Sequence, residues 1–311
     1  MSSFEELYLA ANPDVANAVR DGQFESGMQH YLMFGKREER ALVPIQSRAR
    51  ELTEKVAREK ARKLETIAPL LRTDMPCVTS PLCFDFLNAE LRAQFDIIDT
   101  DIVSGNGYDQ HVLDLIARHP NGLILDCGSG NRSTYYDNVV NFEIAAFDST
   151  DVRGVGEVLP FVDGAFDAVI SLAVLEHVTD PFRCAAEIKR VLKPGGELIC
   201  CAAFLQPYHG YPHHYYNMTH HGLRNLFANE IDIDRIDVYD SVRPIWSLNW
   251  IIQSWAEGLK GQTREDFLNM RLEEFLVPPA KFLGAPFVTE LPVAKNLELA
   301  SACVLFGKKQ L

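Results

Sequence analysis

Helical and strand-like hydrophobic patterns alternate along the second half of the chain, and this alternation predicts an α/β fold. Helix-like segments at 109–118, 180–192 and 219–228 stand between short, continuous apolar runs. Continuous apolar runs are typical of parallel strands that are buried on both faces and connected by helices. The runs occupy residues 122–127, 139–144, 166–172, 197–202, 233–239 and 300–306. We therefore predict a Rossmann-like, doubly wound, mostly parallel sheet over residues 76–311.

A different organisation is expected before this sheet. Residues 1–44 are predicted to form a small helical unit, in which Asn12 is the N-cap and Pro13 the first residue of a helix. Residues 45–75 have apolar positions three and four apart, which predicts an amphipathic connecting helix. That helix would pack on the next domain or pair with a second copy, giving a homodimer through the N-terminal helices.

The segment 243–293 is too long for a plain connection between two strands, so we expect a helical insertion or lid before the last strand. Four aromatic residues in it suggest an apolar or sugar-stacking surface, with ordinary packing as the alternative. They are Trp246, Trp250, Trp255 and Phe267.

Net charge limits the classes of binding partner, and the cysteine pattern limits the kinds of cross-link and metal site that the sequence allows. The net charge of −13 argues against nucleic acid and anionic membranes, because both attract basic surfaces. No apolar run approaches the ~20 residues of a membrane span, and the first residues lack a signal-peptide pattern. The seven cysteines have no Cys-x-x-Cys spacing, so neither a disulfide framework nor a zinc site is predicted. We expect a cytoplasmic protein.

The first apolar run ends in an acid followed by two glycines, in the order Leu125-Asp126-Cys127-Gly128-Ser129-Gly130. Ligands of open parallel sheets bind outside the carboxyl ends of the strands, where glycine lets the backbone approach a ligand. A dinucleotide fingerprint would have a third glycine three residues after Gly130, but Ser133 stands there. This substitution lowers the case for a nicotinamide cofactor.

Four segments in order resemble the class I S-adenosylmethionine-dependent methyltransferases, in particular a methyltransferase type 11-like bacterial subgroup. The first is the Leu125–Gly130 turn. The others are Leu159-Pro160-Phe161-x-x-Gly164-x-Phe166-Asp167, Ser171-Leu172-Ala173-Val174-Leu175-Glu176-His177-Val178, and Val191-Leu192-Lys193-Pro194-Gly195-Gly196. The resemblance implies S-adenosyl-L-methionine as the cofactor.

The resemblance also implies cofactor-binding positions. They comprise Asp126, Gly128, Ser129 and Gly130 in the turn, Glu157 and Leu159 beside adenine, and Ser171 and Ala173 at the end of the fourth strand. Val155 replaces an acid that often contacts adenine in this family. Glu143 and Asp148 compete for the position that binds ribose, and Glu143 is favoured because it lies at the tip of a strand.

Five of the nine histidines lie within residues 209–221, in a segment that a glycine and two prolines make a loop. His213 or His214 is the first candidate for a catalytic base or acceptor ligand, followed by His209. His177 is a second candidate, because it follows the fourth strand. The alternative is a loop held by histidine hydrogen bonds. Clustered imidazoles could bind zinc or iron, but no carboxylate stands among them in sequence, so no metal is predicted.

His220 and His221, in contrast, are expected on the surface in the first turn of the next helix.

The implied activity is methyl transfer to a hydroxyl of a small molecule or saccharide. The alternatives are a nitrogen or carbon acceptor, or a non-catalytic nucleoside-fold subunit for binding or assembly. Tyr8-Leu9-x-x-Asn12-Pro13-Asp14-Val15 and His30-Tyr31-Leu32-x-x-Gly35-x-x-Glu38 resemble a helical module of bacterial glycan- and surface-associated proteins, which hints at a saccharide.

Overall fold

The computed structural model describes residues 4–35, 58–98, 105, 107–210 and 213–309. By its contacts the chain divides into two compact units, Met1–Thr66 and Ile67–Leu311. Residues 58–67 are helical, while residues 45–57 of the expected connecting helix lie outside the described residues. The three-part division expected from the sequence stays a prediction.

The first unit is a group of short helices. Asn12 and Pro13 begin the second helix as expected, but the Asn12 side chain does not cap it and instead donates to the Tyr8 carbonyl at 2.9 Å. The carboxylate of Glu5 accepts the backbone N–H of Gly27 at 2.6 Å and so caps the third helix. The elements are α1 Phe4–Ala11, α2 Pro13–Arg20, α3 Gly27–His30 and the π-helical turn η1 Tyr31–Gly35.

The second unit contains one sheet, to which the described residues contribute seven strands in the order β1-β2-β5-β4-β3-β6-β7. Only the β1–β2 pair is antiparallel. The strands are β1 Val78–Ser80, β2 Cys83–Asp85, β3 Ile124–Cys127, β4 Val139–Glu143, β5 Val152–Arg153, β6 Phe166–Leu172 and β7 Leu192–Cys201. The predicted Rossmann-like, mostly parallel sheet is therefore confirmed.

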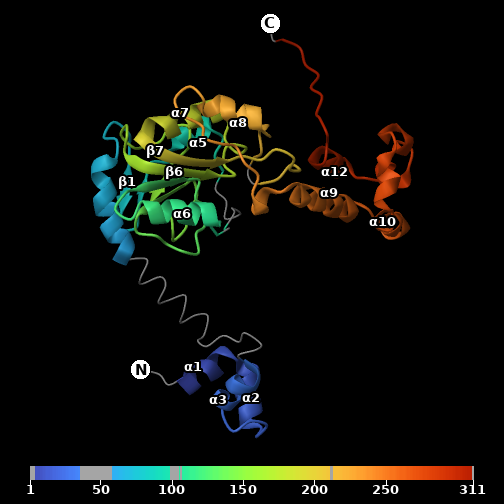
Figure 1. Cartoon of the computed structure of the whole chain (residues 1–311), viewed down its shortest axis with the longest axis horizontal. Helices are drawn as coiled ribbons and strands as arrows, with labels where there is room; N and C mark the ends of the chain where they lie inside the picture. The colour runs from blue at the N-terminus through green and yellow to red at the C-terminus, as the bar shows by residue number, and fades with distance from the viewer. Residues whose placement is uncertain (1–3, 36–57, 99–104, 106, 211–212, 310–311) are drawn as a thin grey trace. The chain divides into compact units, whose positions relative to one another are not determined.

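Helices cover both faces of the sheet: α6 lies on one face, and α7 and α8 lie on the other (Figure 1). The N-cap side chains of these three helices, Asp109, Asp180 and Thr219, each accept a backbone N–H three residues further on. The helices are α5 Ala89–Gln94, α6 Gln110–Arg118, α7 Pro181–Val191 and α8 His220–Phe227. The helices predicted at 109–118, 180–192 and 219–228 are thus confirmed.

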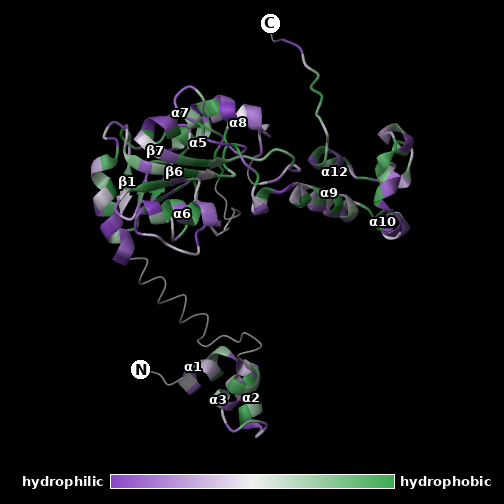
Figure 2. Ribbon diagram, in the orientation of Figure 1, coloured by the Kyte–Doolittle hydropathy of each residue, from purple (hydrophilic) through white to green (hydrophobic). Residues whose placement is uncertain are grey.

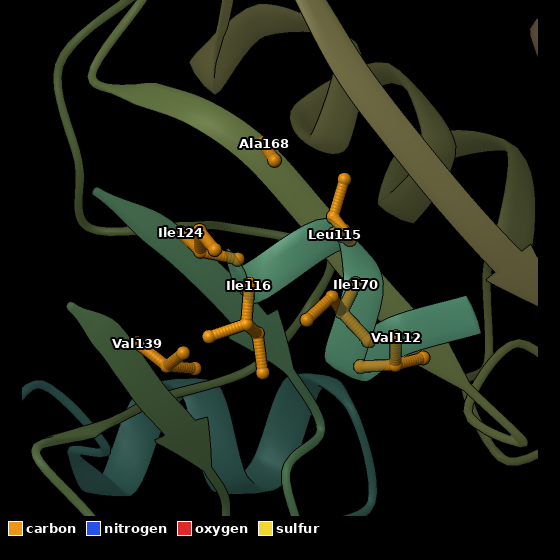
Figure 3. Close-up of a cluster of buried hydrophobic side chains, with 7 residues drawn as sticks. All are labelled: Val112, Leu115, Ile116, Ile124, Val139, Ala168 and Ile170. Carbon is orange, nitrogen blue, oxygen red and sulfur yellow. The ribbon is translucent and has the colours of Figure 1, made fainter. Parts of the chain in front are cut away.

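The core under α6 shows why the apolar runs become central strands. Val112, Leu115 and Ile116 point from the helix onto the strands (Figure 3). They pack against Ile124, Val139, Ala168 and Ile170 of β3, β4 and β6. Most of β6 and the end of β7, residues 198–201, are coloured hydrophobic in Figure 2. Removing this apolar surface from water is the main stabilising contribution to the sheet.

Two predicted strands are wrong. Residues 233–239 and 300–306 are not in strands, and Leu305 and Phe306 are 91% and 93% exposed. An apolar run becomes a strand only when a neighbouring strand satisfies its backbone groups, and neither run is paired in the described structure. Conversely, β1, β2 and β5 are only two or three residues long, too short for a periodic pattern to reveal them.

The expected helical segment, called the insertion below, is present, but none of the described residues after it forms a strand, so it does not precede a last strand as predicted. It consists of α9 Pro244–Gly258, α10 Gly261–Leu268, α11 Pro286–Thr289 and α12 Val293–Glu298, with the 3₁₀ turns η4 Leu272–Leu276 and η5 Pro279–Phe282. Two further 3₁₀ turns are η2 Ala68–Leu70 and η3 Asp240–Val242. Among the helices that the structure describes, none combines the length and apolar character that a bilayer crossing requires.

A buried carboxylate beside β4 gives a stability prediction. Asp151 is fully buried, where it accepts the backbone N–H of Asn141 at 2.9 Å and the hydroxyl of Tyr135. Asp151→Ala removes the acceptor of both hydrogen bonds, one of which comes from a buried backbone N–H, and should lower the free energy of unfolding by about 1–3 kcal/mol, measured by urea denaturation. The exposed Asp234→Ala serves as the control and should change it by less than about 0.5 kcal/mol. Equal losses in both variants would contradict this account of the network.

Candidate functional site

The glycine turn after β3 is tied to the end of β4. The backbone N–H groups of Gly128 and Ser129 donate to the Phe142 carbonyl at 2.9 and 3.0 Å. Gly130 donates its backbone N–H to Oε2 of Glu143 at 2.8 Å. Gly128 and Gly130 have φ values of +79° and +63°, in the left-handed region that favours glycine.

The structure adds a second reason for glycine at position 128. A Cβ there would clash with the Val174 side chain from the turn after β6. The sequence explained this glycine by the approach of a ligand or by the dihedral angles of the turn. Part of the requirement is internal packing, which brings the turns after β3 and β6 into contact.

Glu143 and Asp148, the two candidates for the ribose position, have different environments. Glu143 is the last residue of β4 and is 7% exposed, and its Oε1 accepts the backbone N–H of Ile144 at 2.8 Å. Burial raises the pKa of Glu143, while the backbone N–H groups of Gly130 and Ile144 act in the opposite direction. Asp148 lies exposed in the following turn. Of the two, only Glu143 is a buried carboxylate at the tip of a strand.

Asp126 on β3 is buried next to two residues that sequence reasoning missed. Its Oδ2 accepts hydrogen bonds from the Tyr108 hydroxyl and from a guanidinium N–H of Arg132 at 2.8 Å, while Oδ1 has no hydrogen-bond partner among the described residues. Burial raises the pKa of Asp126, against the opposing charge of Arg132. A cavity of about 210 Å³ lies here, lined by Gly107, Tyr108, Leu113, Arg132, Ser133, Thr134 and Tyr136. No motif signalled Tyr108, because it is far from the glycine turn in sequence.

The residues expected beside adenine are mostly engaged within the protein. Val155 is 1% exposed and packs in a hydrophobic cluster under α5, which explains the absence of an acid there. Oε1 of Glu157 accepts the Thr179 backbone N–H and hydroxyl, both at 3.0 Å, so this carboxylate holds the turn before α7. Leu159 is fully buried.

The chain turns sharply after β6. Ser171 is fully buried on the strand, and Ala173 has a φ of +54°, which is uncommon for a residue with a side chain. Glu176 follows and is fully buried, with Oε1 accepting the Ala203 backbone N–H at 3.3 Å. Within the part of the chain that the structure describes, its Oε2 has no hydrogen-bond partner. Burial raises the pKa of Glu176 to about 7.

His177 and His209 lie edge to face, with ring centroids 5.1 Å apart. Nδ1 of His177 is 2.8 Å from the His213 carbonyl, and Nδ1 of His209 is 2.8 Å from the Pro207 carbonyl. Because a carbonyl only accepts, each Nδ1 carries the proton and each Nε2 keeps a lone pair. Burial lowers the pKa of both imidazoles, which favours the neutral form.

The other two candidate bases, His213 and His214, have different hydrogen-bonding environments. Nδ1 of His214 accepts the His209 backbone N–H at 3.1 Å, and Nε2 donates to Oδ1 of Asn217 at 2.9 Å. Both ring nitrogens of His214 therefore hold the loop. Nε2 of His213 lies 2.8 Å from Oδ2 of Asp96, but the two are not aligned for a hydrogen bond. This geometry favours His177 and His209 over His214 as the base.

His220 and His221, at the start of α8, are exposed as expected.

The insertion contacts this histidine loop. The Trp250 ring on α9 is 5.1 Å from the His209 ring, and the Glu298 carbonyl accepts the Tyr208 backbone N–H at 2.8 Å. Trp255 and Phe267, in contrast, stack inside the insertion with ring centroids 5.9 Å apart. Of the four aromatic residues expected to form a lid, Trp250 is thus the one whose ring lies beside a candidate histidine, while Trp246 is 60% exposed.

Comparison with known families identifies the domain that contains these residues. A family described as "Methyltransferase domain" matches residues 125–200, which run from the second residue of β3 through most of β7. These residues contain the glycine turn, Glu143 and the turn after β6. The chain carries a class I S-adenosylmethionine-dependent methyltransferase domain. The predicted family, with its S-adenosylmethionine cofactor, is therefore confirmed for this domain.

Similar proteins match the methyltransferase domain over a limited length. An uncharacterized methyltransferase of Mycobacterium sp. (strain JLS) is 41% identical over 71 residues, which are 22% of this chain and 27% of that protein. A second, from Mycobacterium avium (strain 104), is 38% identical over 79 residues, 25% of this chain and 30% of that protein. The chain thus spans less than a third of the length of these two relatives.

Among solved structures, phosphoethanolamine N-methyltransferase 2 of Haemonchus contortus with S-adenosyl-L-methionine has a TM-score of 0.34 and 17% identity. That similarity covers 64% of this chain and 50% of that one. The assignment of the methyltransferase domain depends instead on the family match and on the strand order.

The contact between Gly128 and Val174 predicts a stability effect. Gly128→Ala places a methyl group against Val174 and strains a left-handed backbone, so the free energy of unfolding should fall by about 1–3 kcal/mol. Adding Val174→Ala should restore part of that loss, and a double-mutant cycle by urea denaturation measures the coupling. Strictly additive effects would show that the two turns do not touch.

Proposed function

We propose that the chain is an S-adenosylmethionine-dependent methyltransferase that methylates a hydroxyl oxygen of a small molecule or saccharide. The family match supports methyl transfer. Oxygen is proposed as the acceptor atom because of two neutral imidazoles, those of His177 and His209. Their Nε2 lone pairs lie at the carboxyl end of the sheet. A hydroxyl, unlike a basic amine, needs a group to take its proton.

The residues after β3 and β4 fit the cofactor. The carboxylate of Glu143 is already held by the backbone N–H groups of Gly130 and Ile144, and its remaining lone pairs could accept the ribose hydroxyls. Oδ1 of Asp126 is buried and has no hydrogen-bond partner in the described ranges, which suits a positively charged or hydrogen-bonding group nearby. When bound, S-adenosylmethionine supplies an activated methyl group.

The acceptor side is defined by the turn after β6. The contact between Gly128 and Val174 places this turn beside the glycine turn, and Glu176 and His177 follow within three residues. His177 or His209 would accept the proton of the hydroxyl at Nε2, with Trp250 shielding His209 from water. The chain thus positions the oxygen, takes its proton and limits solvent.

A matched pair of variants tests the cofactor site. Glu143→Gln weakens charge-assisted hydrogen bonds to ribose by about 1.5–3 kcal/mol, so the Kd for S-adenosylhomocysteine should rise about 10- to 100-fold in calorimetry. The control Asp148→Asn should leave the Kd unchanged. If only the control weakens binding, Asp148 is the ribose ligand. If the parent protein does not bind S-adenosylhomocysteine at all, the chain is a non-catalytic subunit and the proposed function fails.

A second experiment tests the imidazoles. Whichever of His177→Gln and His209→Gln removes the base should lower turnover about 10²- to 10⁴-fold without changing affinity for S-adenosylhomocysteine, because the base acts on the acceptor. Turnover is measured as methyl transfer to a panel of hydroxylated small molecules and saccharides, with amines included for comparison. His220→Gln, on the exposed start of α8, should behave as the parent protein. Methylation of amines alone would contradict the hydroxyl assignment.

A further inference from the structure

Three side chains at the end of the sheet converge in a way that the sequence does not reveal. Glu176 and His177 come from the turn after β6, and His209 comes from the loop after β7. Each offers one ligand atom, and the three ligand atoms lie within 4.8 Å of one another. The sequence argued against a metal because no carboxylate stood among the clustered histidines, but the fold brings one there from a different strand.

We propose that Glu176, His177 and His209 bind a divalent transition metal ion. Two imidazoles and one carboxylate form a ligand set that suits Fe²⁺, Mn²⁺, Co²⁺ or Zn²⁺. Mg²⁺ and Ca²⁺ prefer a shell of oxygen ligands, so they fit this set less well.

The buried oxygen of Glu176 is the first observation that supports the site. Glu176 is 0% exposed, and while its Oε1 accepts the Ala203 backbone N–H, its Oε2 has no partner among the described residues. Buried polar atoms nearly always have a partner, and an orphan calls for an explanation such as an ion. A cation bound to Oε2 would provide that partner.

The tautomers of the two histidines are the second observation. Backbone carbonyls of His213 and Pro207 fix the protons on Nδ1, which leaves Nε2 of His177 and of His209 available as ligands. A metal-binding histidine commonly donates its other N–H to a carbonyl or carboxylate, which orients the ring. Both histidines already have this second interaction.

The loop backbone is also adapted to the two rings. Gly210 has a φ of +86°, and a Cβ there would lie 3.0 Å from Nδ1 of His177, closer than side chains usually approach. Glycine therefore lets the chain turn directly after His209 while passing close to the His177 ring. The His209 backbone N–H is held in turn by Nδ1 of His214 at 3.1 Å.

The inference about the role of the metal rests on the proposed function. Three protein ligands leave coordination positions for other molecules, and an acceptor hydroxyl in one of them would be oriented and would lose its proton to solvent more easily. His177 and His209 would then act as ligands rather than as bases. Metal binding itself does not depend on the proposed methyl transfer and can be measured without it.

The test uses the full chain and Co²⁺ as the probe. The protein is freed of metal with a chelator, dialysed, and titrated with Co²⁺, and binding is followed by calorimetry and visible absorption. A separate sample is reconstituted with Zn²⁺, and its zinc content is measured by mass spectrometry. We expect one metal per chain. Glu176→Gln, His177→Ala and His209→Ala should each raise the Kd by about 100-fold or more, since losing even an outer-shell partner costs 10- to 100-fold.

A matched control is available on α8. His220 and His221 are an exposed pair whose ring centroids lie 4.1 Å apart, so they report on nonspecific binding by neighbouring imidazoles. Replacing both with Ala should leave the Kd for Co²⁺ unchanged. If this control abolishes binding, or if the parent protein binds no Co²⁺, the proposal is overturned. Circular dichroism shows whether each variant is folded, and the near-isosteric Glu176→Gln guards against loss of the fold.

The two proposals fail in distinguishable ways. If Co²⁺ does not bind but S-adenosylhomocysteine does and His177→Gln abolishes turnover, the metal proposal fails while the proposed function stands. If Co²⁺ binds as expected but S-adenosylhomocysteine does not, the metal site stands and the proposed function fails.

Discussion

The hydrogen bond between the Gly130 backbone N–H and the Glu143 carboxylate is the interaction on which the site depends. It joins the carboxyl ends of β3 and β4, because Gly130 belongs to the turn after one strand and Glu143 ends the other. A buried carboxylate is unfavourable unless such donors stabilise it. Glu143 is therefore held in one position, with the backbone turn fixed beside it, before any ligand binds. Such preorganisation reduces the entropic cost of binding.

The second half of the site follows from the same sheet. β6 lies next to β3 in parallel register, so the turn after β6 meets the glycine turn. The positive φ of Ala173 starts that turn, and the fully buried Glu176 lies inside it. Strained backbone and orphaned polar atoms are features that proteins tend to concentrate at functional sites. Their position beside the glycine turn connects the proposed cofactor site with the proposed acceptor site.

Sequence patterns predicted the central strands and their helices because burial on both faces leaves a continuous apolar signature, as in residues 166–172. The same reasoning failed at 300–306, since pairing depends on a neighbouring strand that no local pattern encodes. At the site, the glycine turn and the preference for Glu143 over Asp148 could be predicted because both lie at the ends of predicted strands. The grouping of Glu176 with His209 could not be predicted, because it depends on how a loop after β7 folds back over β6. Likewise, Arg132 beside Asp126 had no motif to announce it.

The most direct test of the central claim is a crystal structure of the protein with S-adenosylhomocysteine. Our account predicts that the ribose hydroxyls lie within hydrogen-bond distance of the Glu143 carboxylate, with the sulfur directed toward the turn that contains Glu176 and His177. A nucleoside bound elsewhere, with the crevice beside Gly128 filled by side chains, would contradict it.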